Sequence, residues 1–346
     1  MSPNQSYTLN NIQALRALAA IMVILHHALP HYEAMGGNLV FIHFISEWGF
    51  VGVDIFFIIS GFIMAYTTFH KERNIASAKT FFKHRLYRIY LGYWPFFFAM
   101  LSILLVIHSP RLETINIIDS FMLSNIDMFQ LVLPVSWSLS YELYFYFLFL
   151  FTFLFSIKKL YIIIPLFIIF ILSLVLYSFF NPTLSNHFIY SHFLLEFFAG
   201  VLLYMYKEYL MKTWILLFSL LCVIIALYYG ISYENKNGFL RVLTFGSAAF
   251  FIVLSALILE EKKFYRAKGL FVLLGNASYT LYLSHLVIIE LFYLTGLRDL
   301  FTHQHILSPI IGLLLLIILC IIFSILYYQK IEKPIYKKAI HWGKIS

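Results

Sequence analysis

Long apolar runs alternate with short polar segments along the whole chain. A helix needs about 20 apolar residues to cross the hydrocarbon core of a bilayer. Lipid offers no partner to unpaired backbone groups, and these runs are too long for the strands of a barrel, so they are predicted to be helices. The ten predicted spans lie near residues 12–30, 48–69, 92–108, 135–156, 160–180, 187–206, 213–231, 239–259, 272–296 and 308–329.

Two connections between these runs are long. Residues 70–91 are basic and amphipathic, which predicts a segment lying along the cytoplasmic membrane surface. Residues 109–134 are apolar for an external connection, which predicts a re-entrant or capping piece.

The composition agrees with a membrane protein. The chain is 62% hydrophobic and 12% charged, whereas a soluble domain is about 45–50% apolar and about 25% charged. No polar stretch is long enough to fold alone, so we interpret residues 1–346 as a single membrane domain without an appended soluble domain. Cys222 and Cys320 both lie in apolar runs, which excludes a disulfide framework and a cysteine-rich metal site.

The placement of the charges predicts the orientation of the chain. If the N-terminus is cytoplasmic, nineteen of the 24 Lys and Arg residues fall in cytoplasmic segments and four in external ones. Positive residues gather on the cytoplasmic side of membrane proteins, so both termini are predicted to be cytoplasmic. The net charge of +8 is then explained by topology and contact with membrane lipids, and it does not require nucleic acid as a partner.

The first apolar run carries ionisable residues at both ends, and such residues usually mark function. Arg16 and His27 are eleven positions apart, which places them within about 20° of one face and about 16 Å apart along a helix. His26 is turned about 80° from that line and is predicted to serve packing. Alternatively, Arg16 snorkels to the headgroups and His27 marks the far interface.

Two carboxylates are predicted to lie at a depth similar to that of His27. Asp54 and Glu142 both occur early in runs that enter from the outer side. A carboxylate beside an imidazole can fix its tautomer and orientation, so we predict a polar chamber in the outer half. A structural hydrogen bond from Asp54 to a neighbouring helix is the alternative. Small residues in the same run permit close packing of a neighbour: Gly49, Gly52 and Gly61.

The cytoplasmic segment contains the sequence RLYR. Its two arginines, Arg85 and Arg88, share a helical face. They could form a bidentate site for phosphate, which Arg16 would complete. Attraction to anionic lipids explains the same pattern.

The runs near 135–156 and 272–296 carry further polar residues. Ser138 and Ser140 add hydrogen-bond donors, and Trp137 is either part of the chamber or an interfacial anchor. Tyr282 and His285 lie on one stripe of the later run. His285 is predicted to lie midway through the membrane. It is either a ligand contact or a packing histidine whose hydrogen bonds are made within the protein.

Five motifs in this order resemble the membrane acyltransferase-3 family. They are Arg16–x10–His27, GVDIFFIISGF, RLYR, SWSLSYELYFY and SYTLYLSH. The first helix is especially similar to the branch that acetylates exopolysaccharides and O-antigens. Arg85 and Arg88 fall on the family's RxxR, and Glu142 falls on the acidic position after SWSLS. The commoner family pattern has two adjacent acids there, and this chain has one.

The resemblance implies an integral membrane enzyme of ten helices, all α, that takes an acyl group from a cytoplasmic coenzyme A thioester. We expect acetyl-CoA as donor, a polysaccharide or lipid-linked oligosaccharide hydroxyl on the outer side of the bacterial inner membrane as acceptor, and no metal. We expect His27 to act as base or acyl carrier, oriented by Asp54 or Glu142, with the donor phosphates on the three arginines. The residues expected to line the chamber are Ser60, Trp137, Ser138, Ser140, Tyr282 and His285.

Three alternatives stay open at this stage. The chain could be a transporter or flippase for lipid-linked sugars, a transferase of another short acyl group such as succinyl, or a passive lipid-anchored assembly partner. The sequence does not predict the oligomeric state.

Overall fold

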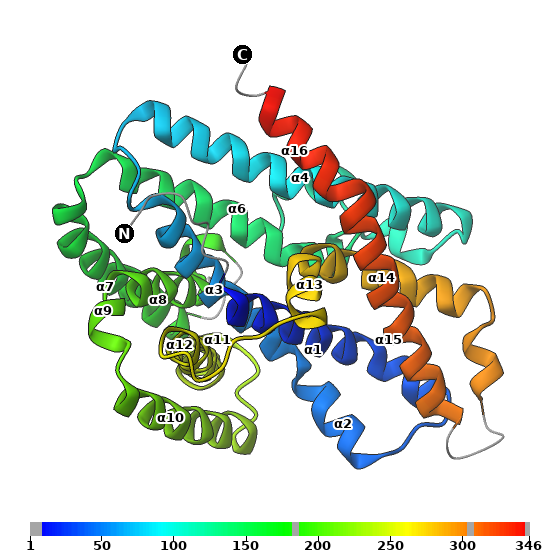
Figure 1. Cartoon of the computed structure of the whole chain (residues 1–346). Coiled ribbons are helices and arrows are strands. Elements are labelled where there is room, and N and C mark those ends of the chain that lie inside the picture. The colour runs from blue at the N-terminus through cyan, green and yellow to red at the C-terminus, as the bar shows by residue number, and fades with distance from the viewer. Residues whose placement is uncertain (1–8, 182–186, 303–307, 343–346) are drawn as a thin grey trace.

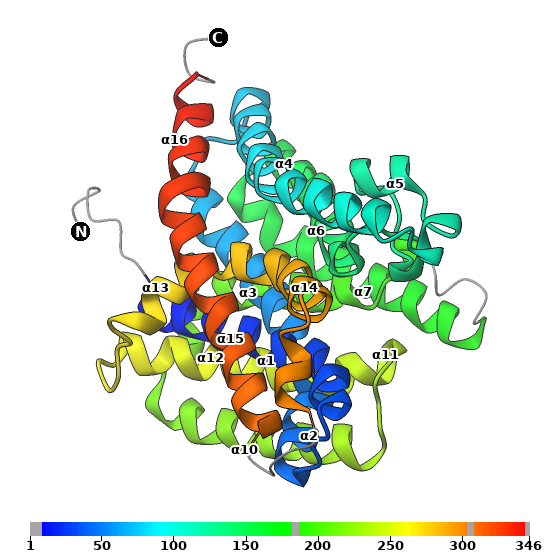
Figure 2. The same ribbon diagram turned by 90° about the vertical axis from the view of Figure 1, so that its right-hand side faces the viewer.

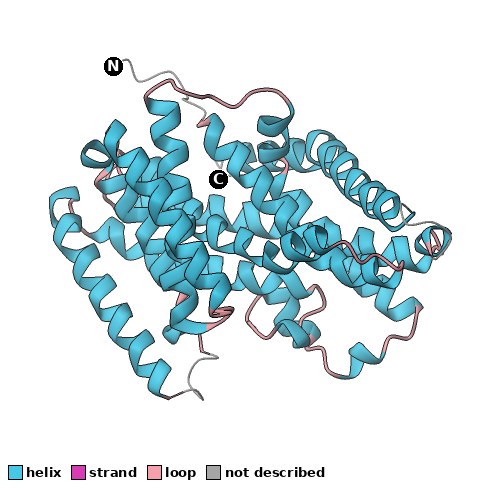
Figure 3. Cartoon of the chain, turned by 90° about the horizontal axis from the view of Figure 1, so that it is seen from below, coloured by secondary structure: helices cyan, strands magenta, loops and turns pink. Residues whose placement is uncertain are grey.

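The computed structural model describes residues 9–181, 187–302 and 308–342, and every regular element in them is a helix (Figure 3). The α-helices are α1 (Asn10–Ala34), α2 (Val40–Glu47), α3 (Val51–Thr68), α4 (Ile75–Val106), α5 (Ile117–Met122), α6 (Trp137–Leu150), α7 (Ile157–Phe180), α8 (Phe193–Met205), α9 (Lys207–Leu210), α10 (Thr213–Ser232), α11 (Gly238–Arg241), α12 (Ser247–Glu261), α13 (Leu270–Asn276), α14 (Ser278–Leu294), α15 (Ser308–Tyr327) and α16 (Lys333–Trp342).

The described residues contain eight helices that are long and apolar enough to cross a membrane. The pair α13 and α14, bent by 77° at its junction, makes a ninth if it is one span. The shorter apolar helix α8 lies where the sixth run was predicted. The protein is therefore an all-α integral membrane protein, as predicted. The count of ten spans and the orientation stay predictions.

The basic stretch after α3 is not a separate segment. Residues 75–106 form one continuous helix, α4, which begins where the Asn74 side chain accepts a hydrogen bond from the Ser77 amide at 2.8 Å. At about 1.5 Å per residue such a helix is much longer than the hydrocarbon core. The RLYR sequence therefore belongs to the same continuous helix that is long and apolar enough to cross the membrane.

The centre of the molecule is built on unusually close helix contacts. A Cβ added at Gly61 of α3 would lie 1.8 Å from the Phe197 carbonyl oxygen of α8. A Cβ at Gly200 of α8 would lie 2.1 Å from the Ile58 oxygen of α3. Gly49 and Gly52 approach the backbone of α1 in the same way, at 2.1 and 2.3 Å. The predicted close approach at the three glycines is confirmed, because any larger residue would force these backbones apart.

The connection 109–134 folds back onto the protein, as expected for a capping piece. Its residues Leu131, Val132 and Leu133 are fully buried. The Tyr93 hydroxyl of α4 donates a hydrogen bond to the Ser120 carbonyl at 2.8 Å, which ties the cap to the span beneath it.

The outer helices of the bundle lie at two opposite edges of the molecule. In Figures 1 and 2, α4 and the C-terminal helix α16 lie at one edge of the molecule, and α10 lies at the opposite edge. The helices α1 and α3 lie between these edges and pack against each other. Arg16 and His27 of α1 are accordingly partly buried within the protein.

Candidate active site

A polar cavity of about 170 Å³ lies between α1, α3, α4, α6 and α14. Three arginines and one carboxylate reach it, although most of its wall is apolar or aromatic. The lining residues are Arg16, Val53, Phe56, Phe57, Ile59, Ser60, Ile63, Arg85, Arg88, Ser138, Leu139, Glu142, Tyr146, Ser278, Tyr279 and Tyr282. Seven of the predicted site residues are among them: Arg16, Ser60, Arg85, Arg88, Ser138, Glu142 and Tyr282.

The three predicted arginines meet at this cavity, although Arg16 comes from α1 and the other two from α4. The Arg85 guanidinium lies over the Tyr146 ring at 5.4 Å, and that of Arg88 lies over the Tyr279 ring at 5.7 Å. Such stacking holds a guanidinium in place without neutralising it. Just outside the span, burial and the positive charge of Arg85 lower the pKa of Lys71. The cluster is therefore suited to an anionic group.

Glu142 belongs to this arginine cluster. Its carboxylate accepts hydrogen bonds from the Ser60 hydroxyl at 3.2 Å and from the Tyr146 hydroxyl, and it attracts Arg16 and Arg88. The prediction that Glu142 orients His27 is wrong for this structure, because its hydrogen bonds run to other partners.

His27 is oriented by its own helix. Its Nδ1 lies 2.9 Å from the Val23 carbonyl oxygen. A carbonyl can only accept, so Nδ1 carries the hydrogen and Nε2 is left as the basic nitrogen. The Val23 carbonyl thus fixes the tautomer and orientation of the His27 ring, which is the role predicted for a carboxylate.

A second imidazole completes the histidine site. The Nε2 of His285, on α14, lies 3.3 Å from Nδ1 of His27, and the two ring centres are 5.0 Å apart. His285 is fully buried and lies next to Tyr282, which lines the cavity. His285 was predicted to be either a ligand contact or a packing histidine, and its contact with His27 favours the first interpretation. His26 faces elsewhere, with Nδ1 3.0 Å from the Ser46 carbonyl oxygen.

Asp54 is not beside His27 in this structure, so the prediction that it orients that ring is wrong. Its two carboxylate oxygens accept from Nε and Nη2 of Arg241, at 2.9 and 2.7 Å. Both side chains are buried, and Glu196 interacts with the same pair. The alternative, a structural bond to a neighbouring helix, is the one observed.

The lining of the cavity does not include the other five predicted residues: His27, Asp54, Trp137, Ser140 and His285. The Trp137 ring packs against Phe193 and Tyr141, with centres 5.2 and 5.8 Å away. The Ser140 hydroxyl is buried and has no hydrogen-bond partner in the described part of the chain. The Trp137 ring also lies 6.3 Å from that of the lining residue Phe57, so it supports the wall from behind.

Sequence reasoning missed three charged residues of these clusters. Arg241 is one of the four basic residues that the predicted orientation assigns to external segments. Glu196 lies in the sixth predicted span without a predicted partner, and Glu332 follows the last predicted span, although it accepts a hydrogen bond from Thr280. Only Glu196 carried a signal, as a carboxylate inside an apolar run. The partners of all three lie far away in the sequence.

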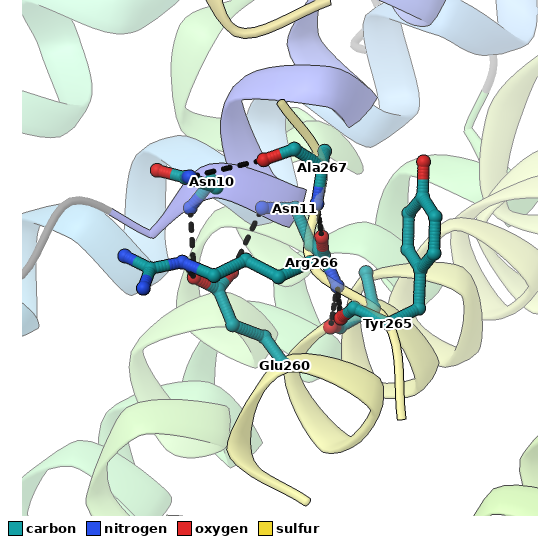
Figure 4. Close-up of polar contacts among 7 residues, drawn as sticks. Asn10, Asn11, Glu260, Tyr265, Arg266 and Ala267 are labelled. Carbon is teal, nitrogen blue, oxygen red and sulfur yellow. Dashed lines mark hydrogen bonds and ion pairs between the residues drawn. The ribbon is translucent and has the colours of Figure 1, made fainter. Parts of the chain in front are cut away.

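The start of α1 is held by residues of α12 and of the loop that follows it (Figure 4). The Glu260 carboxylate accepts from the backbone amides of Asn10 and Asn11, at 3.0 and 2.8 Å. The Asn11 side chain in turn bonds the Tyr265 carbonyl and the Ala267 amide. A carboxylate satisfies the free amides at a helix start and is attracted by its dipole. This cap fixes the helix that carries Arg16 and His27.

Fold and cavity together define a helical membrane protein with an arginine-lined polar cavity beside a histidine pair. A search of curated proteins and a search of solved structures each returned no match. A family model described as an acyltransferase domain matches residues 9–329, nearly the whole chain, so this chain belongs to the acyltransferase-3 family. The protein is thus a multi-pass membrane acyltransferase, and the resemblance predicted from its motifs is confirmed.

Proposed function

We propose that this acyltransferase moves an acetyl group from cytoplasmic acetyl-CoA to a hydroxyl of a cell-surface or extracellular polysaccharide, or of its lipid-linked precursor, at the bacterial inner membrane. The observation that carries the proposal is the convergence of Arg16, Arg85 and Arg88 on one cavity. Arginine clusters recognise phosphate through paired, charge-assisted hydrogen bonds, and coenzyme A is a phosphate-bearing acyl carrier.

Helix α1 sets the distance between the proposed phosphate site and the proposed base. Arg16 and His27 lie on the same unbroken helix, about 16 Å apart along its axis. With the phosphates held by the arginines, the linear pantetheine arm carries the thioester along the cavity toward the histidine pair. The coenzyme therefore need not cross the membrane.

His27 is the proposed base. Its Nε2 takes the proton from the acceptor hydroxyl while the hydroxyl oxygen bonds to the thioester carbonyl carbon. The carbon–sulfur bond breaks, and the thiolate takes up the proton to leave as free coenzyme A. An alternative order, in which Nε2 first accepts the acetyl group, uses the same nitrogen.

A reconstituted assay tests this proposal. Purified protein in lipid nanodiscs is given acetyl-CoA with a labelled acetyl group and surface polysaccharide or lipid-linked precursor, and base-labile label in the glycan is measured. Transfer from succinyl-CoA in preference to acetyl-CoA would show that the donor is succinyl-CoA. Movement of lipid-linked sugar across the membrane without incorporation of label would favour a flippase. Mass spectrometry of surface glycans with and without the gene would identify the acceptor.

The arginine cluster gives a separate kinetic prediction. Arg16→Ala and Arg88→Ala should each raise KM for acetyl-CoA by about 10- to 100-fold, because each removes a charge-assisted bond worth about 1.5–3 kcal/mol. Steady-state kinetics at fixed acceptor concentration measure this. Lys79→Ala is the matched control, because Lys79 is an exposed cation of the same helix α4. An equal KM in all three variants would favour the lipid-binding interpretation of this basic helix.

A further inference from the structure

Helix α14 begins inside the ninth predicted span and not at its end. It follows α13 after the single residue Ala277, with a bend of 77° between the two helices. A Cβ added at Gly275, near the end of α13, would lie 2.0 Å from the carbonyl oxygen of Gln13 on α1. Gln13 lies on the turn of α1 that leads to Arg16. The break therefore places the start of α14 close to the arginine cluster.

The first turn of α14 forms part of the wall of the arginine-lined cavity. Ser278 and Tyr279 both line it, and the Arg88 guanidinium lies over the Tyr279 ring at 5.7 Å. The first amides of a helix have no carbonyl partner within it and carry the positive end of its dipole. Ala277 stands at the N-cap position and has no side-chain oxygen that could accept from these amides. The start of α14 therefore adds positive potential to this wall.

The Ser278 side chain gives independent evidence for a ligand at the same wall. It is fully buried, and its hydroxyl has no hydrogen-bond partner in the described part of the chain. Buried hydroxyls are normally paired, and an unpaired one costs free energy. The Thr280 hydroxyl of the same turn donates to the Glu332 carboxylate, which is outside the lining of the cavity. Ser278 thus keeps an unused donor on a residue that lines the cavity.

We propose that the start of α14 binds a phosphate group of the acyl donor. The Ser278 hydroxyl donates to a phosphate oxygen, and the first amides of α14 stabilise the negative charge. Arg16 of α1 and Arg88 of α4 bind the same anionic part of the ligand. Helix starts are recurrent phosphate sites, and broken membrane helices direct their inner starts at anionic substrate groups. This inference rests on the proposed function, because it takes coenzyme A as the ligand of the cavity.

Binding of coenzyme A to the purified protein in nanodiscs tests the proposal without any acyl chemistry. Ser278→Ala should raise Kd by about 10- to 100-fold, because it removes a hydrogen bond to a charged group. It should not lower the melting temperature, because the hydroxyl that it removes has no partner within the described residues. Loss of affinity without loss of stability separates a ligand contact from a packing role.

Ser284→Ala is the matched control for this measurement. Ser284 lies on the same helix, is fully buried and has a hydroxyl without a partner among the described residues, but it does not line the cavity. Its replacement should leave Kd unchanged. Equal weakening by Ser284→Ala, or a parallel loss of stability in Ser278→Ala, would assign the effect to packing and overturn the proposal.

A second variant keeps the test decisive if Ser278→Ala does not fold. Ser278→Asp places a carboxylate at a helix start, where it is favourable for the fold, but it repels a phosphate. Kd for coenzyme A should therefore rise by more than about 100-fold. The inhibition constant of inorganic pyrophosphate, as a competitor of coenzyme A, should rise in the same variants. No displacement by pyrophosphate, or an equal inhibition constant in all the proteins, would overturn the assignment to a phosphate group.

The failure of this inference can be distinguished from failure of the proposed function. An unchanged Kd in the folded Ser278 variants, with weakened binding in Arg16→Ala, would overturn the role of the helix start and leave the proposed function standing. No binding of coenzyme A to the unsubstituted protein would overturn both.

Discussion

His27→Ala should lower kcat for acyl transfer by about 10²- to 10⁴-fold, which is the usual contribution of a positioned general base. The loss follows from the structure of α1, because the Val23 carbonyl holds the Nδ1 hydrogen and leaves Nε2 as the basic nitrogen. Alanine is a good helix former, so the helix and its insertion should persist. Acetyl transfer by variant and unsubstituted protein in nanodiscs, at equal folded concentration, gives the ratio.

His26→Ala is the matched control for this prediction. The two histidines are adjacent, yet His26 faces the Ser46 carbonyl of α2, whereas His27 contacts His285. Its replacement should leave kcat within a few-fold of the original value. Loss of transfer in His26→Ala together with full activity in His27→Ala would show that the base has been assigned to the wrong ring.

The position of His27 could be predicted from the sequence because a single helix determines it. Residues of one helix have a fixed angular and axial relation, and Arg16, His26 and His27 all lie on the single helix α1. The same reasoning put Arg85 and Arg88 on one face of α4. Both arginines do line the cavity with Arg16.

Pairing between helices could not be predicted in this way. Depth in the membrane suggested that Asp54, Glu142 and His27 would meet, but depth leaves the rotation of each helix and its neighbours undetermined. Glu142 turns toward Ser60 and Tyr146, and Asp54 turns toward Arg241. Close packing of α3 against α1 and α8 at Gly52 and Gly61 sets the rotation of the helix that carries Asp54. The hydrogen-bond partners of Glu142 and Asp54 are therefore known only from the three-dimensional structure.

The pair of Asp54 and Arg241 gives the second large effect, on stability. Asp54→Ala and Arg241→Ala should each lower the free energy of unfolding by about 3–5 kcal/mol, because each leaves the other charge buried without its partner. Asp54 is fully buried and Arg241 is 8% exposed, so water cannot replace the lost bonds. Thermal unfolding in detergent, followed by the helical signal, measures the loss.

A double substitution separates this structural role from catalysis. Asp54→Ala combined with Arg241→Ala should cost less than the two single losses added together, since neither member of the ion pair is left buried without the other. Asp299→Ala is the control, because its ion pair with Arg298 is exposed and such pairs contribute about 0–1 kcal/mol. Asp54→Ala protein that keeps its stability but loses kcat by about 10²-fold or more would instead mean that Asp54 acts on the reaction through His27. We expect the opposite result, because both oxygens of Asp54 are committed to Arg241.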